Sequence, residues 1–112
     1  MHITPTVGRV VWFRPSTKDP LSKSVNGEPL AGHVARVNDD GTVNLMVISS
    51  EGLPESRKRV PLCQGDSPRP KKRGGASWCE WMPYQVALAK TGDPAFAMQQ
   101  AGQMVGGNVG AG

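Results

Sequence analysis

The central stretch of the chain, residues 30–48, runs LAGHVARVNDDGTVNLMVI. Two apolar runs, residues 30–37 and 42–48, flank the turn sequence Asn-Asp-Asp-Gly, in which Gly41 can adopt a positive φ angle. One face of the second run carries the alternating apolar residues Val43, Leu45 and Val47. Alternation with a period of two is typical of a half-buried strand. The stretch therefore predicts an antiparallel β-hairpin.

Three further segments have the composition of short strands. Residues 7–14 combine β-branched and aromatic side chains and end at a proline. Residues 56–63 contain Pro61, which has no N–H to donate and therefore belongs at a sheet edge or a strand end. Residues 77–82 also stop at a proline. With these strands, we expect the core to contain Val10, Val34, Val37, Val43, Leu45, Val47, Val60 and Leu62.

Five short strands with a tight central hairpin predict an all-β fold, a small five-stranded SH3-like β-barrel. Fourteen glycines and ten prolines in 112 residues break the chain too often for a helix bundle. An oligonucleotide-binding barrel is the alternative. That fold usually has a helix between its third and fourth strands, and residues 49–55 leave no room for one.

The C-terminal part differs in composition. Residues 85–90 and 93–104 are rich in Ala, Gln and Met, and Asp93 followed by Pro94 suits a helix start, so we expect a short helix there. The glycine-rich end is expected to be flexible until a partner orders it. We accordingly divide the chain into a β-barrel domain, residues 1–86, and an Ala/Gly-rich helix and tail, residues 87–112.

The positive charge is local. The net charge is +4 and the isoelectric point is about 9.4. Seven of the thirteen basic residues are Arg57, Lys58, Arg59, Arg69, Lys71, Lys72 and Arg73. Such a patch attracts phosphate backbones or an acidic protein surface, although a solvated loop would have the same composition.

No motif in the sequence points to catalysis or to a cofactor. Cys63 and Cys79 lie 16 positions apart without Cys-x-x-Cys spacing, which favours two buried thiols over a disulfide or a metal site. Glu51 and Glu55 sit in a short turn, where exposed acids are common. We expect no enzyme, no metal and no cofactor. The apolar runs are too short to span a membrane, and we expect synthesis in the cytoplasm.

Aromatic residues follow the basic segment. Trp78, Trp81 and Tyr84 next to basic side chains supply the charge and stacking that single-strand nucleic-acid binders use. The apolar neighbours of the tryptophans favour a place in the core instead. Trp78 and Trp81 fall on opposite faces of an ideal strand, so one should seal the core while the other meets a neighbouring segment or a partner.

Three stretches of the sequence carry a resemblance. TPTVGRVVWFRP at residues 4–15, PLAGHVARVNDDGTVNLMVISSEGLP at 29–54 and CEWMPYQ at 79–85 resemble a family of small proteins of tailed bacteriophages and prophages of proteobacteria. The resemblance covers residues 4–86 and carries no catalytic residues over. The basic insert PRPKKRGG and the glycine-rich end depart from the family pattern.

The resemblance implies a genomic setting in which a small non-enzymatic barrel has two common uses. We expect a virion accessory protein, a capsid decoration or cement protein or another minor structural component, that binds capsid or tail subunits in many copies. The alternative is a nucleic-acid-binding or host-factor-binding barrel that acts during infection. The expected partner-binding residues are Arg69, Lys71, Lys72, Arg73, Trp78, Trp81, Tyr84, Phe96, Met98 and Met104.

Overall fold

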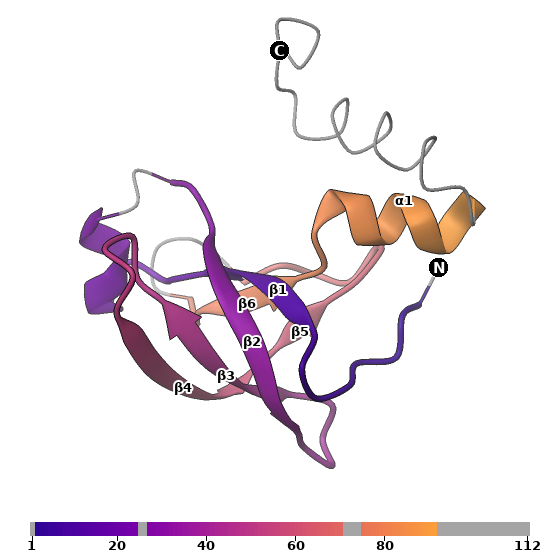
Figure 1. The fold of residues 1–112 in the computed structure, drawn as a ribbon, viewed down its shortest axis with the longest axis horizontal. Coiled ribbons are helices and arrows are strands. Elements are labelled where there is room, and N and C mark those ends of the chain that lie inside the picture. Colours follow the sequence, from indigo (N-terminus) through magenta and orange to yellow (C-terminus); the bar gives the residue numbers. More distant parts are fainter. Residues whose placement is uncertain (1, 25–26, 71–74, 92–112) are drawn as a thin grey trace, which may run out of the picture.

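The computed structural model describes residues 2–24, 27–70 and 75–91, which form a curled, mostly β structure with one short α-helix (Figure 1). One six-stranded sheet has the order β4-β3-β2-β1-β6-β5. Its strands are β1 (Val10–Arg14), β2 (Leu30–Val37), β3 (Val43–Ile48), β4 (Pro54–Val60), β5 (Leu62–Cys63) and β6 (Trp78–Glu80). A 3-10 helix, η1 (Pro20–Ser24), and the helix α1 (Pro83–Thr91) complete it. The all-β prediction is confirmed at this level.

The central hairpin forms where the sequence predicts it. β2 and β3 pair antiparallel from Ala31↔Ile48 to Val37↔Val43. Gly41 has a φ angle of 87° at the turn. The carboxylate of Asp40 accepts hydrogen bonds from the backbone N–H and the hydroxyl of Thr42, at 2.9 and 2.6 Å. These local hydrogen bonds satisfy polar groups of the turn and fix the register of the two strands.

The predicted fourth strand is divided in two at Pro61, so the sheet has six strands rather than five. β4 pairs with β3, and β5 pairs in parallel with β6. Arg59 has a φ angle of 52° near the end of β4, where the β3–β4 register shifts. Between β4 and β5, the carbonyl of Pro61 accepts a hydrogen bond of 2.8 Å from the Cys79 N–H. Since β4 and β5 are the two ends of the sheet order, the short link at Pro61 carries the chain from one edge of the curled sheet to the other.

The core confirms the prediction for the central strands and corrects it for the first. Val34, Val43, Leu45, Val47 and Val60 are buried, and Val37 and Leu62 are partly buried against them. The prediction of Val10 as a core residue is wrong, because Val11 and Phe13 are the fully buried residues of β1. Cys63, Cys79 and Trp81 are also buried, which confirms the expectation of two buried thiols and one core tryptophan. Leu30 and Ala87 are core residues that the sequence did not single out.

The register of β1 explains this correction. Val11 lies opposite Gly32 of β2, and a Cβ at Gly32 would lie 3.2 Å from Leu45 Cδ1 and 3.5 Å from Val11 Cγ2. The missing side chain thus leaves the space that Val11 and Leu45 fill. β1 also begins three residues later than predicted, because residues 7–8 form a turn in which Gly8 has a φ angle of 94°.

The helix begins at Pro83, a residue that ends the last strand in the sequence prediction. Gln85 ties the helix start to the sheet, since its Oε1 accepts from the Met82 N–H at 2.8 Å and its Nε2 donates to the Val10 carbonyl at 3.0 Å. The predicted domain boundary at residue 86 falls within this helix. The predicted helix at 93–104 and the glycine-rich end lie outside the described residues. No helix of the described ranges is long and apolar enough to cross a membrane.

Candidate functional site

A pocket of about 850 Å³ lies beside the strands β1 and β6. Its walls come from the start of the chain, the segment before β2, the segment after β5 and the helix α1. We call it the tryptophan pocket. It is lined by Ile3, Trp12, Arg14, Gly27, Glu28, Pro29, Cys63, Gln64, Gly65, Asp66, Arg69, Glu80, Trp81, Pro83, Val86 and Lys90.

Strand alternation explains why Trp12, Arg14 and Glu80 line the pocket. Val11 and Phe13 enter the core, so Trp12 and Arg14 point to the opposite, outer face of β1. Residues directly opposite each other in an antiparallel pair point to the same side of the sheet. The pairs Trp12↔Glu80 and Arg14↔Trp78 therefore bring β6 side chains to the same outer face.

Arg14 is held in place by three contacts. Its Nε donates to Glu80 Oε2 at 2.9 Å, and one terminal nitrogen donates to the Gly27 carbonyl at 3.3 Å. Its guanidinium also lies 5.4 Å from the centre of the Trp12 ring. The resulting cation–π contact and ion pair hold Trp12, Arg14 and Glu80 in one arrangement.

A second arginine lies over a second tryptophan. The guanidinium of Arg69 is 5.5 Å from the centre of the Trp78 ring. One terminal nitrogen of Arg69 donates to the carbonyls of Gly65 and Ser67, at 3.2 and 2.6 Å. The loop after β5 thus positions a cation over a half-buried aromatic ring.

Trp81 is the tryptophan that joins the core, with 4% of its surface exposed. It also contributes to the wall of the pocket. Its indole Nε1–H is buried and has no hydrogen-bond acceptor among the described residues. A buried donor without an acceptor costs on the order of 1–3 kcal/mol, so an acceptor supplied from outside would be stabilised here.

The predicted partner-binding residues fall into three groups. Arg69 and Trp78 are brought together, and Trp81 lies in the pocket wall. Tyr84 is half-buried on α1 and does not line the pocket. The remaining predictions, Lys71, Lys72, Arg73, Phe96, Met98 and Met104, lie outside the described residues.

Trp12, Arg14 and Glu80 were missed by the sequence prediction, although all three line the pocket. The uninterrupted apolar run VVWF hides which of its members face outward. The available signal was Arg14, because a charged residue two positions from Trp12 marks the face that both share.

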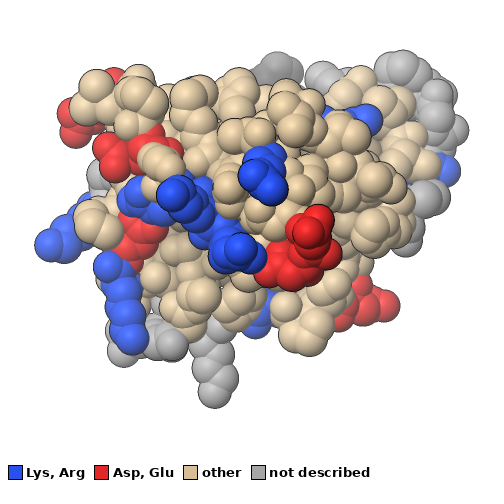
Figure 2. All heavy atoms as spheres, turned by 90° about the horizontal axis from the view of Figure 1, so that it is seen from below, with Lys and Arg blue, Asp and Glu red and all other residues tan. Residues whose placement is uncertain are grey.

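Outside the pocket, two of the described arginines, Arg57 and Arg59, are paired with acids. Arg57 contacts Asp19 at 2.8 Å and Glu55 at 3.8 Å, and Arg59 contacts Asp40 at 3.3 Å. Figure 2 shows this mixture of positive and negative side chains on one face of the molecule. These pairs reduce the positive potential that the sequence alone would suggest for this region.

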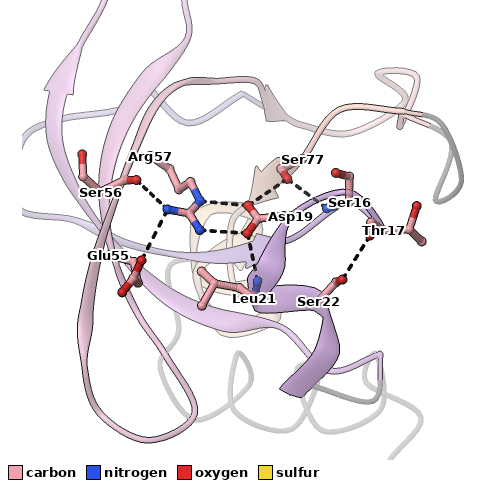
Figure 3. Close-up of polar contacts among 9 residues, drawn as sticks. All are labelled: Ser16, Thr17, Asp19, Leu21, Ser22, Glu55, Ser56, Arg57 and Ser77. Atoms are coloured by element: carbon pink, nitrogen blue, oxygen red, sulfur yellow. Dashed lines mark hydrogen bonds and ion pairs between the residues drawn. The ribbon is translucent and has the colours of Figure 1, made fainter.

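Asp19 is the centre of a separate polar network (Figure 3). Its carboxylate accepts two hydrogen bonds from Arg57, one from the Leu21 N–H at 3.0 Å and one from the Ser77 hydroxyl at 3.5 Å. The Ser77 hydroxyl oxygen in turn accepts from the Ser16 N–H at 2.9 Å. The hydrogen bonds from Arg57 hold the pKa of Asp19 below its usual value. With these contacts the network joins η1, β4 and the segment before β6.

Both cysteines are buried, and only Cys63 also lines the tryptophan pocket. Cys79 is fully buried in the core, and burial raises the pKa of its thiol to about 12. Cys63 lies opposite Glu80 and lines the tryptophan pocket. Burial also raises the pKa of Cys63. Within the described ranges, no group of three or more His, Cys, Asp or Glu residues could hold a metal ion.

Comparison with known proteins found no match: no family model, no curated protein and no solved structure is similar to the chain. The chemistry of the tryptophan pocket is therefore the basis for assigning a function. It combines aromatic faces, an internal ion pair, further charged side chains at its walls and one buried donor that finds no acceptor in the described part of the chain. These are the features of a binding site.

Proposed function

We propose that the chain is a non-enzymatic binding protein, an accessory component of a bacteriophage particle that attaches to neighbouring virion subunits through the tryptophan pocket. The observation that supports this role is the pairing of Trp12 with Arg14 and of Trp78 with Arg69 on one outer face. Tryptophan and arginine dominate the energetics of protein interfaces, and rings and guanidiniums held in place lose little entropy on binding.

The proposal takes the curled sheet to be an SH3-like barrel. Its support is the strand order, in which β1 lies between β2 and β6 and consecutive hairpins join β2, β3 and β4. The bend at Pro61 adds to this, because it carries the chain from one edge of the sheet to the other. A closed sheet has no long free edge, which suits a protein packed in many copies on a repeated surface.

Within the particle, the expected place is the capsid surface, as a decoration or cement protein. The resemblance of residues 4–86 to a family of phage and prophage proteins supports this setting. A pocket of this size gives a modest interface, and many copies on a repeated lattice offset a weak single contact. Synthesis would take place in the cytoplasm of the host bacterium, before assembly into the virion.

The test is mass spectrometry of particles purified from cells that produce the phage encoding this chain. We expect the native chain in the particles and the loss of a Trp12→Ser variant from them. Met46→Ser is the matched control, because Met46 is 42% exposed on β3 and does not line the pocket. Circular dichroism of both variants checks that they fold. Absence of the native chain from the particles, or equal incorporation of both variants, would contradict the proposal.

Nucleic-acid binding is the second candidate, and the position of Arg69 over Trp78 is the observation that favours it. A cation above an aromatic ring is the arrangement that stacks and neutralises a single strand. The ion pairs of Arg57 and Arg59 count against it. Binding of single-stranded DNA that weakens steeply with salt, and that Arg69→Gln and Trp78→Ala remove, would reverse the order of the two candidates.

A further inference from the structure

We infer that residues 2–7 form a strap along one wall of the tryptophan pocket, which the side chain of Gln64 holds closed and which opens when His2 takes up a proton. Such a strap controls access to the pocket, whichever partner the pocket receives. Three observations support it: the way in which the strap is attached, the orientation of the Gln64 amide, and the place of His2 beside that amide.

The strap is an extended segment outside the sheet (Figure 1). Its end next to β1 is fixed, because the Gly8 N–H donates to the Val34 carbonyl at 2.8 Å. In the described part of the chain, no backbone–backbone hydrogen bond joins residues 2–5 to another segment. Ile3 packs against the core and lines the tryptophan pocket. Movement of the strap about the turn at Gly8 therefore opens one wall of the pocket.

One side chain, that of Gln64, takes the place of a neighbouring strand. Its Oε1 accepts from the Ile3 N–H at 2.8 Å, and its Nε2 donates to the Ile3 carbonyl at 3.0 Å. An amide has its acceptor at one end and its donors at the other, so these two hydrogen bonds fix its orientation. The amide nitrogen of Gln64 is therefore the atom that faces His2.

His2 contacts the second hydrogen of that amide nitrogen. Its Nε2 lies 3.2 Å from Gln64 Nε2. Since the amide nitrogen is a donor, the imidazole nitrogen has to accept, which requires a neutral ring with its hydrogen on Nδ1. A protonated imidazole carries hydrogens on both nitrogens and accepts none. Proton uptake by His2 thus replaces a hydrogen bond with two donors that face each other, and this weakens the hold of Gln64 on the strap.

The charges around this contact do not hold a protonated His2 in place. The charged side chains that line the pocket together with Gln64 are Arg14, Glu28, Asp66, Arg69, Glu80 and Lys90. Three of them are positive and three are negative, so they exert no net attraction on a cation. Within the described ranges, none of them forms an ion pair with His2.

The test is the exchange of the Ile3 amide hydrogen with solvent, measured by nuclear magnetic resonance on the full chain. About pH 8 and about pH 5 are compared, because histidine side chains change their charge between them. The readout is the protection factor, which removes the intrinsic effect of pH on exchange. We expect it to fall about threefold to tenfold at the lower pH, the effect of one ordinary hydrogen bond. The indole resonances of Trp12 and Trp81 should move with the same midpoint, since both rings line the pocket.

Two substitutions separate the proton of His2 from its side chain. His2→Gln keeps an acceptor that does not titrate, so the Ile3 amide should stay protected at both pH values. His2→Lys has a permanent positive charge and no acceptor, so the amide should exchange fast at both. His33→Gln is the matched control, because His33 lies opposite Val10 and Met46 and does not line the pocket. It should keep the full pH effect.

Gln64→Glu should reverse the effect. Its carboxylate still accepts from the Ile3 N–H, but it presents an acceptor to His2, so a protonated His2 now tightens the strap. Protection of the Ile3 amide should then rise toward about pH 5, where a glutamate is still mostly ionised. An unchanged protection factor in the native chain, a pH effect that survives His2→Gln, or the loss of the effect in His33→Gln would overturn the inference.

Discussion

Arg57 and Asp19, which are 38 positions apart in the sequence, are joined by two parallel hydrogen bonds of 2.8 Å, from Nε to Oδ2 and from a terminal nitrogen to Oδ1. This fork-to-fork geometry is the strongest form of an Arg–carboxylate contact. It holds η1 against β4, the strand at one end of the sheet order. An edge strand covered and charged in this way is protected from pairing with another chain.

Asp19→Ala should lower the free energy of unfolding by about 1–3 kcal/mol, because a partly buried guanidinium loses its charged acceptor. Chemical denaturation measures the change. Arg59→Gln is the control, since it removes only an exposed ion pair with Asp40 and should have a much smaller effect. Equal losses in both variants would show that the Asp19 network is no stronger than a surface pair.

The same network predicts a pH dependence. The pKa of Asp19 in the folded chain lies below its ordinary value of 3.8, chiefly because of the hydrogen bonds from Arg57. Its contribution to stability is therefore fully present above 3.8 and is lost as the pH falls through the folded pKa. The stability difference between the native chain and Asp19→Asn should shrink as denaturation is repeated toward low pH. A difference that stays constant would contradict the assigned cause.

Gly41→Ala should destabilise the chain by about 1–2 kcal/mol through backbone strain alone. The φ angle of Gly41 is 87°, and a Cβ there would meet nothing within 4 Å, so no steric contact contributes. Gly41→Asn should cost less, because asparagine tolerates left-handed backbone better than alanine. Thermal unfolding of the two variants compares them, and the reverse order would exclude backbone strain as the cause.

Leu45→Ala should lower the free energy of unfolding by about 2–5 kcal/mol, because it leaves a cavity in the core. Leu45 is 3% exposed, whereas its neighbour Met46 on the same strand is 42% exposed. Met46→Ala should therefore cost less than about 1 kcal/mol. The pair of variants tests the face assignment of β3, since a slip of one residue would reverse the two results.

The hairpin was predictable because its signals are local. The turn residues and the alternating run from Val43 to Val47 determine both the pairing and the buried face within a few positions. The face of β1 was not predictable, because VVWF is apolar throughout and only the pairing with Gly32 decides which side is buried. Pro61 illustrates an intermediate case. Its missing N–H correctly predicted a strand end, but not that the chain would continue as β5 along the opposite edge.

The candidate site was predictable only in part, because some of its contacts are local in the sequence and others join distant strands. Trp78 and Arg69 belong to one late segment, so their proximity followed from the sequence. The Trp12 and Glu80 pairing depends on strands that are far apart in the chain. The basic segment of β4 was misleading, because the acids that neutralise Arg57 and Arg59 come from distant loops.

The two thiols give the last prediction, because only one of them lines the pocket. Cys63 lines the pocket, and Cys79 is fully buried with a pKa of about 12. A small alkylating reagent should modify Cys63 first, slowly near neutral pH because its pKa is also raised. Cys79 should react only on unfolding. Mass spectrometry of peptides after timed alkylation gives both rates.

The raised pKa of Cys79 also affects stability at high pH. The unfolded chain releases this proton near the ordinary value of 9.0, whereas the folded chain keeps it up to about 12. Because the folded state then binds more protons, stability should fall as the pH rises from 9.0 toward about 12. Cys79→Ala removes this part of the decline, and Cys63→Ala removes less of it. Modification of Cys79 before Cys63 in the folded protein would contradict the placement of both thiols.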